Sequence, residues 1–331
     1  MARGILERLG DGPVLGDGGY LLELEKRGYV QAGPFTPEVV IEHPDALAQL
    51  HREFLRAGAE ALQTMTFYAS DDKLATVGLA GKVDEINRTA VKVAREVASE
   101  GDALVAGNLS LTWAYLPEDA SSADHVRELF DRQLRDQTDA GPPDFWIGET
   151  FSYLGEALLF VERARATGLP VMVTMSFEQP VARSYEGETP ADCARKLSDA
   201  GADIVGVNCL NGPEQQLPIA LEMRSAVGGF VAAQPVAYRT NAEQPDFTSS
   251  PNFPYALDPM QLSRHEMAEF ASKAKDGGID YIGSCCGSVQ GHLRAMAKAL
   301  GKVPGSEREW KSTSGRAMSA YEYHEHTETE V

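Results

Sequence analysis

Eight short apolar runs, each followed by a stretch with helical periodicity, constrain the fold of this chain more than any other feature. The runs are continuously apolar rather than alternating, which is typical of parallel strands covered on both faces. They lie at residues 14–19, 60–67, 103–110, 144–150, 170–177, 203–210, 230–238 and 281–287. The amphipathic stretches lie at residues 45–57, 83–99, 123–139, 153–166, 190–200, 214–226, 263–275 and 289–300.

Eight strand-then-helix units predict an α/β fold, a (β/α)8 TIM-type barrel, with an open doubly wound sheet as the alternative. We place the barrel at residues 1–302 and a polar C-terminal tail at residues 303–331. The longest insertion, residues 239–262, follows the seventh run, and long loops in compact domains are often functional. Because the C-terminal ends of barrel strands share one face, which carries the active site, we expect functional residues at those ends.

The charge of the chain argues against two classes of partner. Its 49 acidic and 30 basic residues give a formal charge of −19, which repels the phosphates of nucleic acid and anionic lipid. No stretch resembles a transmembrane span of ~20 apolar residues, and the N-terminal sequence MARGILERLGDG lacks the apolar run of a signal peptide. We therefore expect a cytoplasmic protein that binds neither nucleic acid nor membrane, and whose cysteines stay reduced.

Three of the four cysteines fall at the ends of apolar runs. Cys209 ends the sixth run, and the adjacent Cys285 and Cys286 end the eighth, whereas Cys193 lies in a helical pattern and is expected to pack there. Adjacent cysteines do not readily form a disulfide with each other. Three thiolates with one open position would suit a catalytic zinc ion. The alternatives are burial as small apolar side chains and a redox site built on vicinal thiols.

The residues around these cysteines resemble the homocysteine S-methyltransferase family. GVNC at residues 206–209 and GSCCG at residues 283–287 are similar to the family's zinc signature. The segments GDGGY, LEKRGYVQAGPFTPE, HREFLRAGAEALQTMTFYAS, EGDALVAG and QPVAYRT extend the likeness over roughly residues 4–300, toward betaine-using members. The family fold is a (β/α)8 barrel.

This resemblance implies an enzyme, a methyltransferase with a Zn²⁺ cofactor. Its metal ligands, which are also its catalytic group, would be Cys209, Cys285 and Cys286. The reaction would move a methyl group from glycine betaine to homocysteine, giving dimethylglycine and methionine. Three thiolates leave zinc with a net negative charge, which would keep an additional bound sulfur reactive.

The resemblance also implies residues that bind the acceptor. Asp17 and Glu149 match carboxylates that the family uses for the homocysteine ammonium, although Asp17 also reads as a turn aspartate. Gly18 and Gly19 would let the backbone approach a ligand carboxylate closely. Further polar side chains could hydrogen-bond a ligand or a cysteine sulfur: Gln63, Asn108 and Gln234.

For the donor, Phe35 and Tyr68 match the family's aromatic cage. A quaternary ammonium has no hydrogen to donate, so aromatic faces hold it, and phenylalanine is a weaker cation–π face than the tryptophan of related vertebrate enzymes. Trp113 and Tyr115 would widen or complete the donor pocket, or form an exposed lid. Thr150 stands where the related enzyme has a tyrosine, which would change the resting coordination of the metal.

These departures leave alternatives open. The donor could instead be another quaternary ammonium or a sulfonium compound, namely proline betaine, a dimethylsulfonium compound or S-methylmethionine. A non-catalytic zinc-binding barrel is a further alternative. After Cys209 the chain reads LNGP rather than a histidine-containing turn, so the rim of the site differs. The related enzyme continues into a C-terminal arm used for assembly, so either a monomer or a homo-oligomer is expected.

Overall fold

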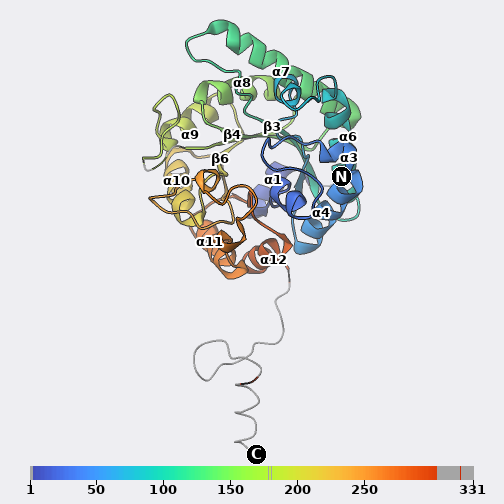
Figure 1. Cartoon of the computed structure of the whole chain (residues 1–331). Coiled ribbons are helices and arrows are strands. Elements are labelled where there is room, and N and C mark those ends of the chain that lie inside the picture. The colour runs from blue at the N-terminus through green and yellow to red at the C-terminus, as the bar shows by residue number, and fades with distance from the viewer. Residues whose placement is uncertain (1–2, 178, 180, 304–320, 322–331) are drawn as a thin grey trace, which may run out of the picture.

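A barrel of parallel strands surrounded by helices is seen in the computed structural model, which describes residues 3–177, 179, 181–303 and 321 (Figure 1). The strand order is β1-β8-β7-β6-β5-β4-β3-β2, and every paired neighbour is parallel. This confirms the (β/α)8 TIM-type prediction. The strands are β1 (Val14–Leu15), β2 (Ala61–Gln63), β3 (Leu104–Ser110), β4 (Phe145–Phe151), β5 (Val171–Met175), β6 (Ile204–Asn208), β7 (Phe230–Gln234) and β8 (Tyr281–Ile282).

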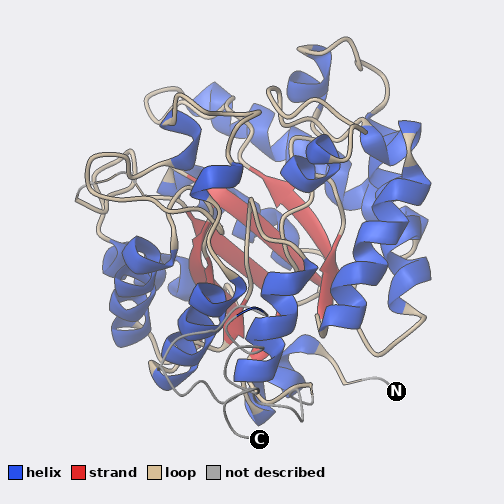
Figure 2. Cartoon of the chain, turned by 60° about the horizontal axis from the view of Figure 1, so that its bottom comes forward, coloured by secondary structure: helices blue, strands red, loops and turns tan. Residues whose placement is uncertain are grey.

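The helices cover the outside of the strands (Figure 2). Eight of them match the predicted amphipathic stretches: α4 (Pro44–Ala57), α6 (Val83–Ala98), α7 (Ala120–Ala140), α8 (Leu154–Arg165), α9 (Pro190–Asp199), α10 (Pro213–Ala226), α11 (Arg264–Asp276) and α12 (Gln290–Ala299). The sequence reading missed four short helices: α1 (Ile5–Asp11), α2 (Leu21–Lys26), α3 (Val39–Glu42) and α5 (Asp71–Ala75). None of the helices in the described residues is long and apolar enough to cross a membrane.

Seven of the eight strands are shorter than the apolar runs that predicted them, and β4 has the same length as its run. β6 ends at Asn208, so Cys209 lies just beyond it, and Cys285 and Cys286 lie in the loop after β8, not within that strand. The backbone leaves the strand conformation at Cys209, whose φ is 58°. Cys209 is buried and Cys285 and Cys286 are half-buried although all three lie beyond the strand ends, so hydrophobicity alone did not mark where each strand ends.

The seam between β1 and β2 closes the barrel largely through side chains. The Glu60 N–H donates to the Leu15 carbonyl at 2.8 Å, and the Leu15 N–H donates to the Glu60 carboxylate at 2.9 Å. Further along, the Gln63 N–H donates to Oδ2 of Asp17 at 2.6 Å. The Asp17 carboxylate thus accepts a strand N–H that would otherwise be buried without a partner.

The long insertion at residues 239–262 packs over the loop that contains Cys209. Its two short 3₁₀ turns are η1 (Phe247–Ser249) and η2 (Asp258–Met260). The Phe247 N–H donates to the Leu210 carbonyl at 3.3 Å, and the Asn211 amide donates to the Pro245 carbonyl at 2.7 Å. The insertion therefore lies on the face where the functional residues were expected. Apart from residues 303 and 321, the predicted tail lies outside the described residues.

Close packing between β6 and β7 generates a prediction about Gly206. A Cβ at this position would lie 2.3 Å from the Ala232 carbonyl oxygen, and backbone on a central strand cannot yield easily. We expect Gly206→Ala to lower the free energy of unfolding by about 1–3 kcal/mol, which is the typical cost of adding a methyl group to a well-packed core. Gly228→Ala is the control, because nothing lies within 4 Å of its Cβ position. Urea unfolding of both variants checks this; equal stability would contradict it.

Candidate metal centre and substrate pocket

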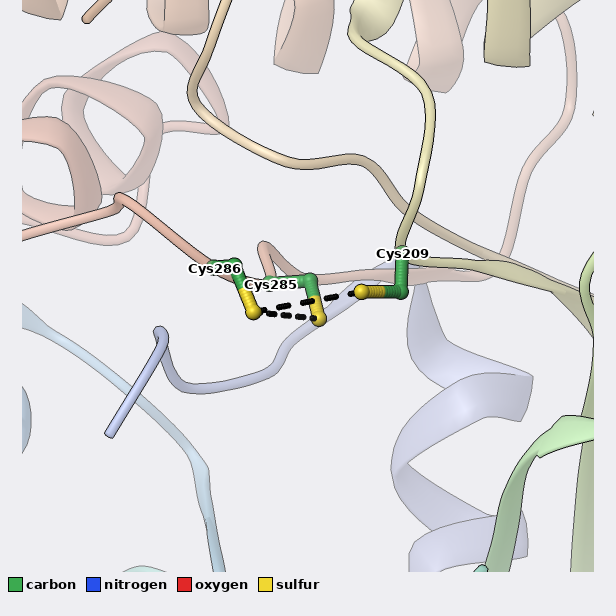
Figure 3. A group of neighbouring side chains, drawn as sticks. All are labelled: Cys209, Cys285 and Cys286. Carbon is green, nitrogen blue, oxygen red and sulfur yellow. Dashed lines mark hydrogen bonds between the residues drawn. The ribbon is translucent and has the colours of Figure 1, made fainter. Parts of the chain in front are cut away.

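Three cysteine sulfurs converge on the C-terminal face of the barrel (Figure 3). The Sγ atoms of Cys209 and Cys286 are 3.9 Å apart, those of Cys285 and Cys286 are 4.0 Å apart, and all three lie within 4.8 Å of one another. A tetrahedral zinc ion with Zn–S bonds of ~2.3 Å separates its sulfur ligands by about 3.8 Å. The spacing fits this coordination, and the predicted meeting of these residues is confirmed.

The electrostatics of the cluster favour a bound cation. The pKa of Cys209 lies well below its usual value, because Cys285 and Cys286 hydrogen-bond to its sulfur. The same clustering raises the pKa values of Cys285 and Cys286 well above theirs. Without a metal, the cluster therefore favours ionisation of the Cys209 thiol and disfavours ionisation of the other two. A divalent metal would reverse this, since a coordinating thiol is deprotonated outright. Cys193 is buried within α9, away from this group, as expected.

Backbone hydrogen bonds hold the two cysteine loops together. The Cys209 N–H donates to the Gln234 carbonyl at 2.9 Å, and the Cys285 N–H donates to the Pro235 carbonyl at 2.8 Å. Both loops are thus attached to the end of β7, which lies between β6 and β8 in the sheet. This shared support brings together residues that are far apart in the sequence.

The glycine pair after β1 packs against the vicinal cysteines. A Cβ on Gly19 would lie 2.7 Å from the Cys285 carbonyl oxygen, and one on Gly18 would lie 2.6 Å from Oγ of Ser288. The Gly19 N–H donates to the same Ser288 hydroxyl at 2.8 Å. Both glycines also line the pocket, so lack of a side chain serves the packing of the metal loop as well as the space for a ligand.

A pocket lies next to the three sulfurs. Of the predicted substrate residues, Gly18, Gly19, Phe35 and Glu149 line it, whereas Asp17 and Tyr68 do not. Its remaining lining residues, besides the cysteines, are Tyr20, Leu21, Gln63, Thr64, Met65, Phe67, Asn108, Thr150, Gln234 and Ser284. The pocket therefore joins the cysteines to polar side chains from several strand ends and to two phenylalanine rings.

Glu149 is the acidic side chain of this lining, and two amides hold it. Its Oε1 accepts a hydrogen bond from the Asn108 amide at 2.6 Å, and its Oε2 accepts one from the Asn208 amide at 3.0 Å. Burial nevertheless raises the pKa of Glu149 to about 8. A cationic ligand group in the pocket would favour the ionised form of this carboxyl. The site therefore suits an ammonium.

Asn208 also connects Glu149 to its strained neighbour. Its amide donates to the Thr150 hydroxyl, and its carbonyl accepts from the Thr150 N–H, both at 2.8 Å. Thr150 has a φ of 64°, which is unfavourable for a β-branched residue and occurs where surrounding structure imposes it. The sequence reading missed Asn208, although it stands directly before Cys209 in the GVNC motif.

Asp17 lies behind the pocket wall in a buried hydrogen-bonded chain. Its Oδ2 accepts from the Tyr20 hydroxyl, which also lies 3.0 Å from Nδ1 of His51. Burial raises the pKa of Asp17 to about 7 and lowers that of His51 to about 3, so His51 is neutral. The other carboxylate oxygen of Asp17, Oδ1, has no hydrogen-bond partner among the described residues. Tyr20 and His51 were not singled out from the sequence.

Two phenylalanines form the aromatic wall of the pocket. Phe35 and Phe67 have ring centroids 6.5 Å apart, and Phe253 of the long insertion stacks on Phe35 at 5.8 Å. Tyr68 lies one ring further out, with its centroid 4.3 Å from that of Phe67. Phe67 was missed as a wall residue, because the sequence does not reveal which of two consecutive rings turns inward.

Trp113 and Tyr115, the two residues predicted at the rim of the pocket, have different surroundings. The Trp113 indole N–H donates to the Tyr68 hydroxyl at 2.6 Å, and Trp113 is 55% exposed. Tyr115 instead packs edge-on against Tyr153 at 5.6 Å. Trp113 therefore belongs to the outer rim of the pocket, next to Tyr68, while Tyr115 is engaged with the start of α8.

Comparisons with known proteins agree on one family. A family model described as homocysteine S-methyltransferase matches residues 14–300. Betaine--homocysteine S-methyltransferase 1 of Danio rerio is 45% identical over 97% of this chain and 82% of its own length. S-methylmethionine--homocysteine S-methyltransferase BHMT2 of Pongo abelii is 42% identical over 90% of this chain and 81% of its own length. The metallated homocysteine methyltransferase MmuM from Escherichia coli shares the fold, with a TM-score of 0.71 at 20% identity, covering 88% of this chain and 99% of that chain.

The cysteine geometry predicts how metal binding depends on each thiol. We expect Cys209→Ala, Cys285→Ala and Cys286→Ala each to lose most bound zinc, because two sulfurs cannot replace the three-thiolate set. Cys193→Ala, which removes a thiol buried elsewhere, should keep full zinc content. Metal analysis of the purified variants measures this. Retention of stoichiometric zinc in Cys286→Ala would contradict the assignment.

Proposed function

Because this chain belongs to the homocysteine S-methyltransferase family, we propose that it transfers a methyl group from glycine betaine to homocysteine, giving dimethylglycine and methionine. The observation that carries the proposal is the placement of three converging thiols beside a pocket with an acidic side and an aromatic side. The protein is a methyltransferase with a (β/α)8 barrel.

The reaction places specific demands on the pocket. The homocysteine sulfur attacks a methyl carbon, a C–S bond forms as the C–N bond breaks, and the electron pair remains on the departing nitrogen. An anionic sulfur and a cationic nitrogen thereby become neutral, so the transition state is less charged than the reactants. A pocket that excludes water favours such a step when other contacts offset the cost of desolvating both ions.

We propose that Cys209, Cys285 and Cys286 hold Zn²⁺. When bound, zinc would lower the pKa of the substrate thiol and so supply a thiolate at neutral pH. The chain's own contribution is to keep the three sulfurs together through the loops attached to β7. The spacing of the sulfurs and the pKa pattern of the cluster support this assignment.

For the acceptor, Glu149 is the residue best placed to bind the homocysteine ammonium. Each of its carboxylate oxygens accepts one amide hydrogen bond, which fixes its orientation and leaves further lone pairs for a ligand. Asp17 would add negative charge from behind the wall formed by Gly18 and Tyr20. Gly18 and Gly19 would leave room for the amino acid backbone of homocysteine.

For the donor, Phe35 and Phe67 would form the aromatic surface that contacts the trimethylammonium group. Tyr68 was predicted in that role and would act from the outer layer, through its contacts with Phe67 and Trp113. S-methylmethionine is the second candidate donor. A relative named as an S-methylmethionine--homocysteine S-methyltransferase is 42% identical to this chain, and a relative named for betaine is also 42% identical.

A donor panel tests the proposal. Purified protein with zinc and homocysteine should form methionine fastest with glycine betaine, compared with proline betaine, a dimethylsulfonium compound and S-methylmethionine. Faster turnover with S-methylmethionine would show that S-methylmethionine, and not glycine betaine, is the preferred donor. Stoichiometric zinc without turnover of any donor would instead identify a non-catalytic metal-binding barrel.

The role of Glu149 predicts a selective loss of acceptor affinity. Glu149→Gln keeps the shape of the side chain but removes its charge, and a charge-assisted hydrogen bond is worth about 1.5–3 kcal/mol. We expect the KM for homocysteine to rise about tenfold or more, with little change in the KM for the donor. The comparison acceptor is 4-mercaptobutanoate, which lacks the ammonium and should respond much less. An equal rise in KM for both thiols would rule out the contact.

A further inference from the structure

The ionisable side chains in the described lining of the pocket are all acids, which can carry only negative charge. Its ionisable members are Glu149, Tyr20 and the three cysteines, and no lysine, arginine or histidine is among them. A donor such as glycine betaine is a zwitterion, with a cationic onium end and an anionic carboxylate end. Coulomb forces in a site shielded from water would therefore turn the onium end toward the sulfurs and the carboxylate end outward. The carboxylate then requires a partner at the rim.

Lys73, on the short helix α5, is a cation in a suitable place. Its Nζ lies 4.2 Å from the centroid of the Tyr68 ring and 5.7 Å from that of Trp113. The side chain is half-buried and forms no ion pair within the described part of this strongly acidic chain. Burial lowers its pKa, and no neighbouring carboxylate raises it. The ammonium thus keeps its three N–H donors available.

A continuous set of rings connects this ammonium to the pocket. Tyr68, beneath Lys73, is in contact with Phe67, and Phe67 lines the pocket. The Trp113 indole N–H donates to the Tyr68 hydroxyl, which fixes both rings beneath the cation. Tyr68 and Trp113 also have positive φ angles of 56° and 63°. Such strained backbone conformations cluster at functional sites. Lys73 therefore lies at the outer edge of the aromatic wall.

We propose that Lys73 binds the carboxylate of the methyl donor, so that the enzyme selects onium carboxylates. The donor's cationic end would lie against Phe35 and Phe67, and its anionic end would reach the ammonium held over Tyr68 and Trp113. This inference rests on the proposed methyl transfer and deepens it by naming the class of donor. It also assigns Tyr68 and Trp113 as positioning residues, since they hold the cation that contacts the donor.

The test compares two donors that differ only in the charge of the far end. Glycine betaine carries a carboxylate, and its carboxamide carries the same trimethylammonium group with a neutral amide. Lys73→Met keeps an unbranched side chain only one atom shorter but removes the charge. We expect the KM for glycine betaine to rise about tenfold or more, and the KM of the carboxamide, or its competitive inhibition constant, to change less than about twofold. Lys73→Arg should restore most of the affinity.

The matched control is Lys82→Met, which removes a lysine that pairs with Glu85 on the surface and should leave both donors unaffected. An equal change for both donors in Lys73→Met, or no change for either, would overturn the assignment. The homocysteine KM should remain near the wild-type value in every variant. Wild-type turnover of glycine betaine is measured in the same assay, so failure of the proposed methyl transfer is distinguishable from failure of the Lys73 contact.

Discussion

Mutual repulsion among three sulfurs is the constraint on which the site depends. With Sγ–Sγ separations of 3.9 and 4.0 Å, three thiolates would repel one another strongly in a buried setting. The fold holds the sulfurs there by anchoring both cysteine loops to β7 and by packing Gly19 against the vicinal pair. A divalent cation would relieve that repulsion, so metal binding would also stabilise the local fold.

The end of β6 joins the three-cysteine cluster to Glu149, on the proposed acceptor side of the pocket. Asn208 is buried, lies next to Cys209, and uses its amide to hold both Glu149 and Thr150. An amide in this position can both donate and accept, which a carboxylate could not do beside Glu149. The orientation of Glu149, the proposed partner of the acceptor ammonium, is therefore tied to β6, which ends directly before the first cysteine.

The sequence predicted the architecture and the meeting of the three cysteines because both depend on short-range patterns combined with one topological rule. Apolar runs and helical periodicity identified all eight units, and the shared C-terminal face brought Cys209 to the vicinal pair. Asn208, Phe67 and Lys73 were missed for physical reasons. The contacts of Asn208 depend on which side chains meet inside the barrel, and the place of Phe67 depends on which ring turns inward beside Tyr68, whose φ is positive. Lys73 lies on α5, a short helix that the sequence did not predict. None of these properties leaves a periodic signal.

The seam between β1 and β2 has a consequence for how the barrel opens. The other strand junctions in the described barrel are ladders of backbone pairing, but here Asp17 and Glu60 supply carboxylate acceptors in place of carbonyls. Local opening, which exposes backbone amides to hydrogen exchange, should begin at this junction. Asp17 thus accepts a strand N–H at this junction and is also an acidic group beside the proposed acceptor pocket. Loss of turnover in an Asp17 variant could therefore result from a weakened junction between β1 and β2 as readily as from loss of a substrate contact.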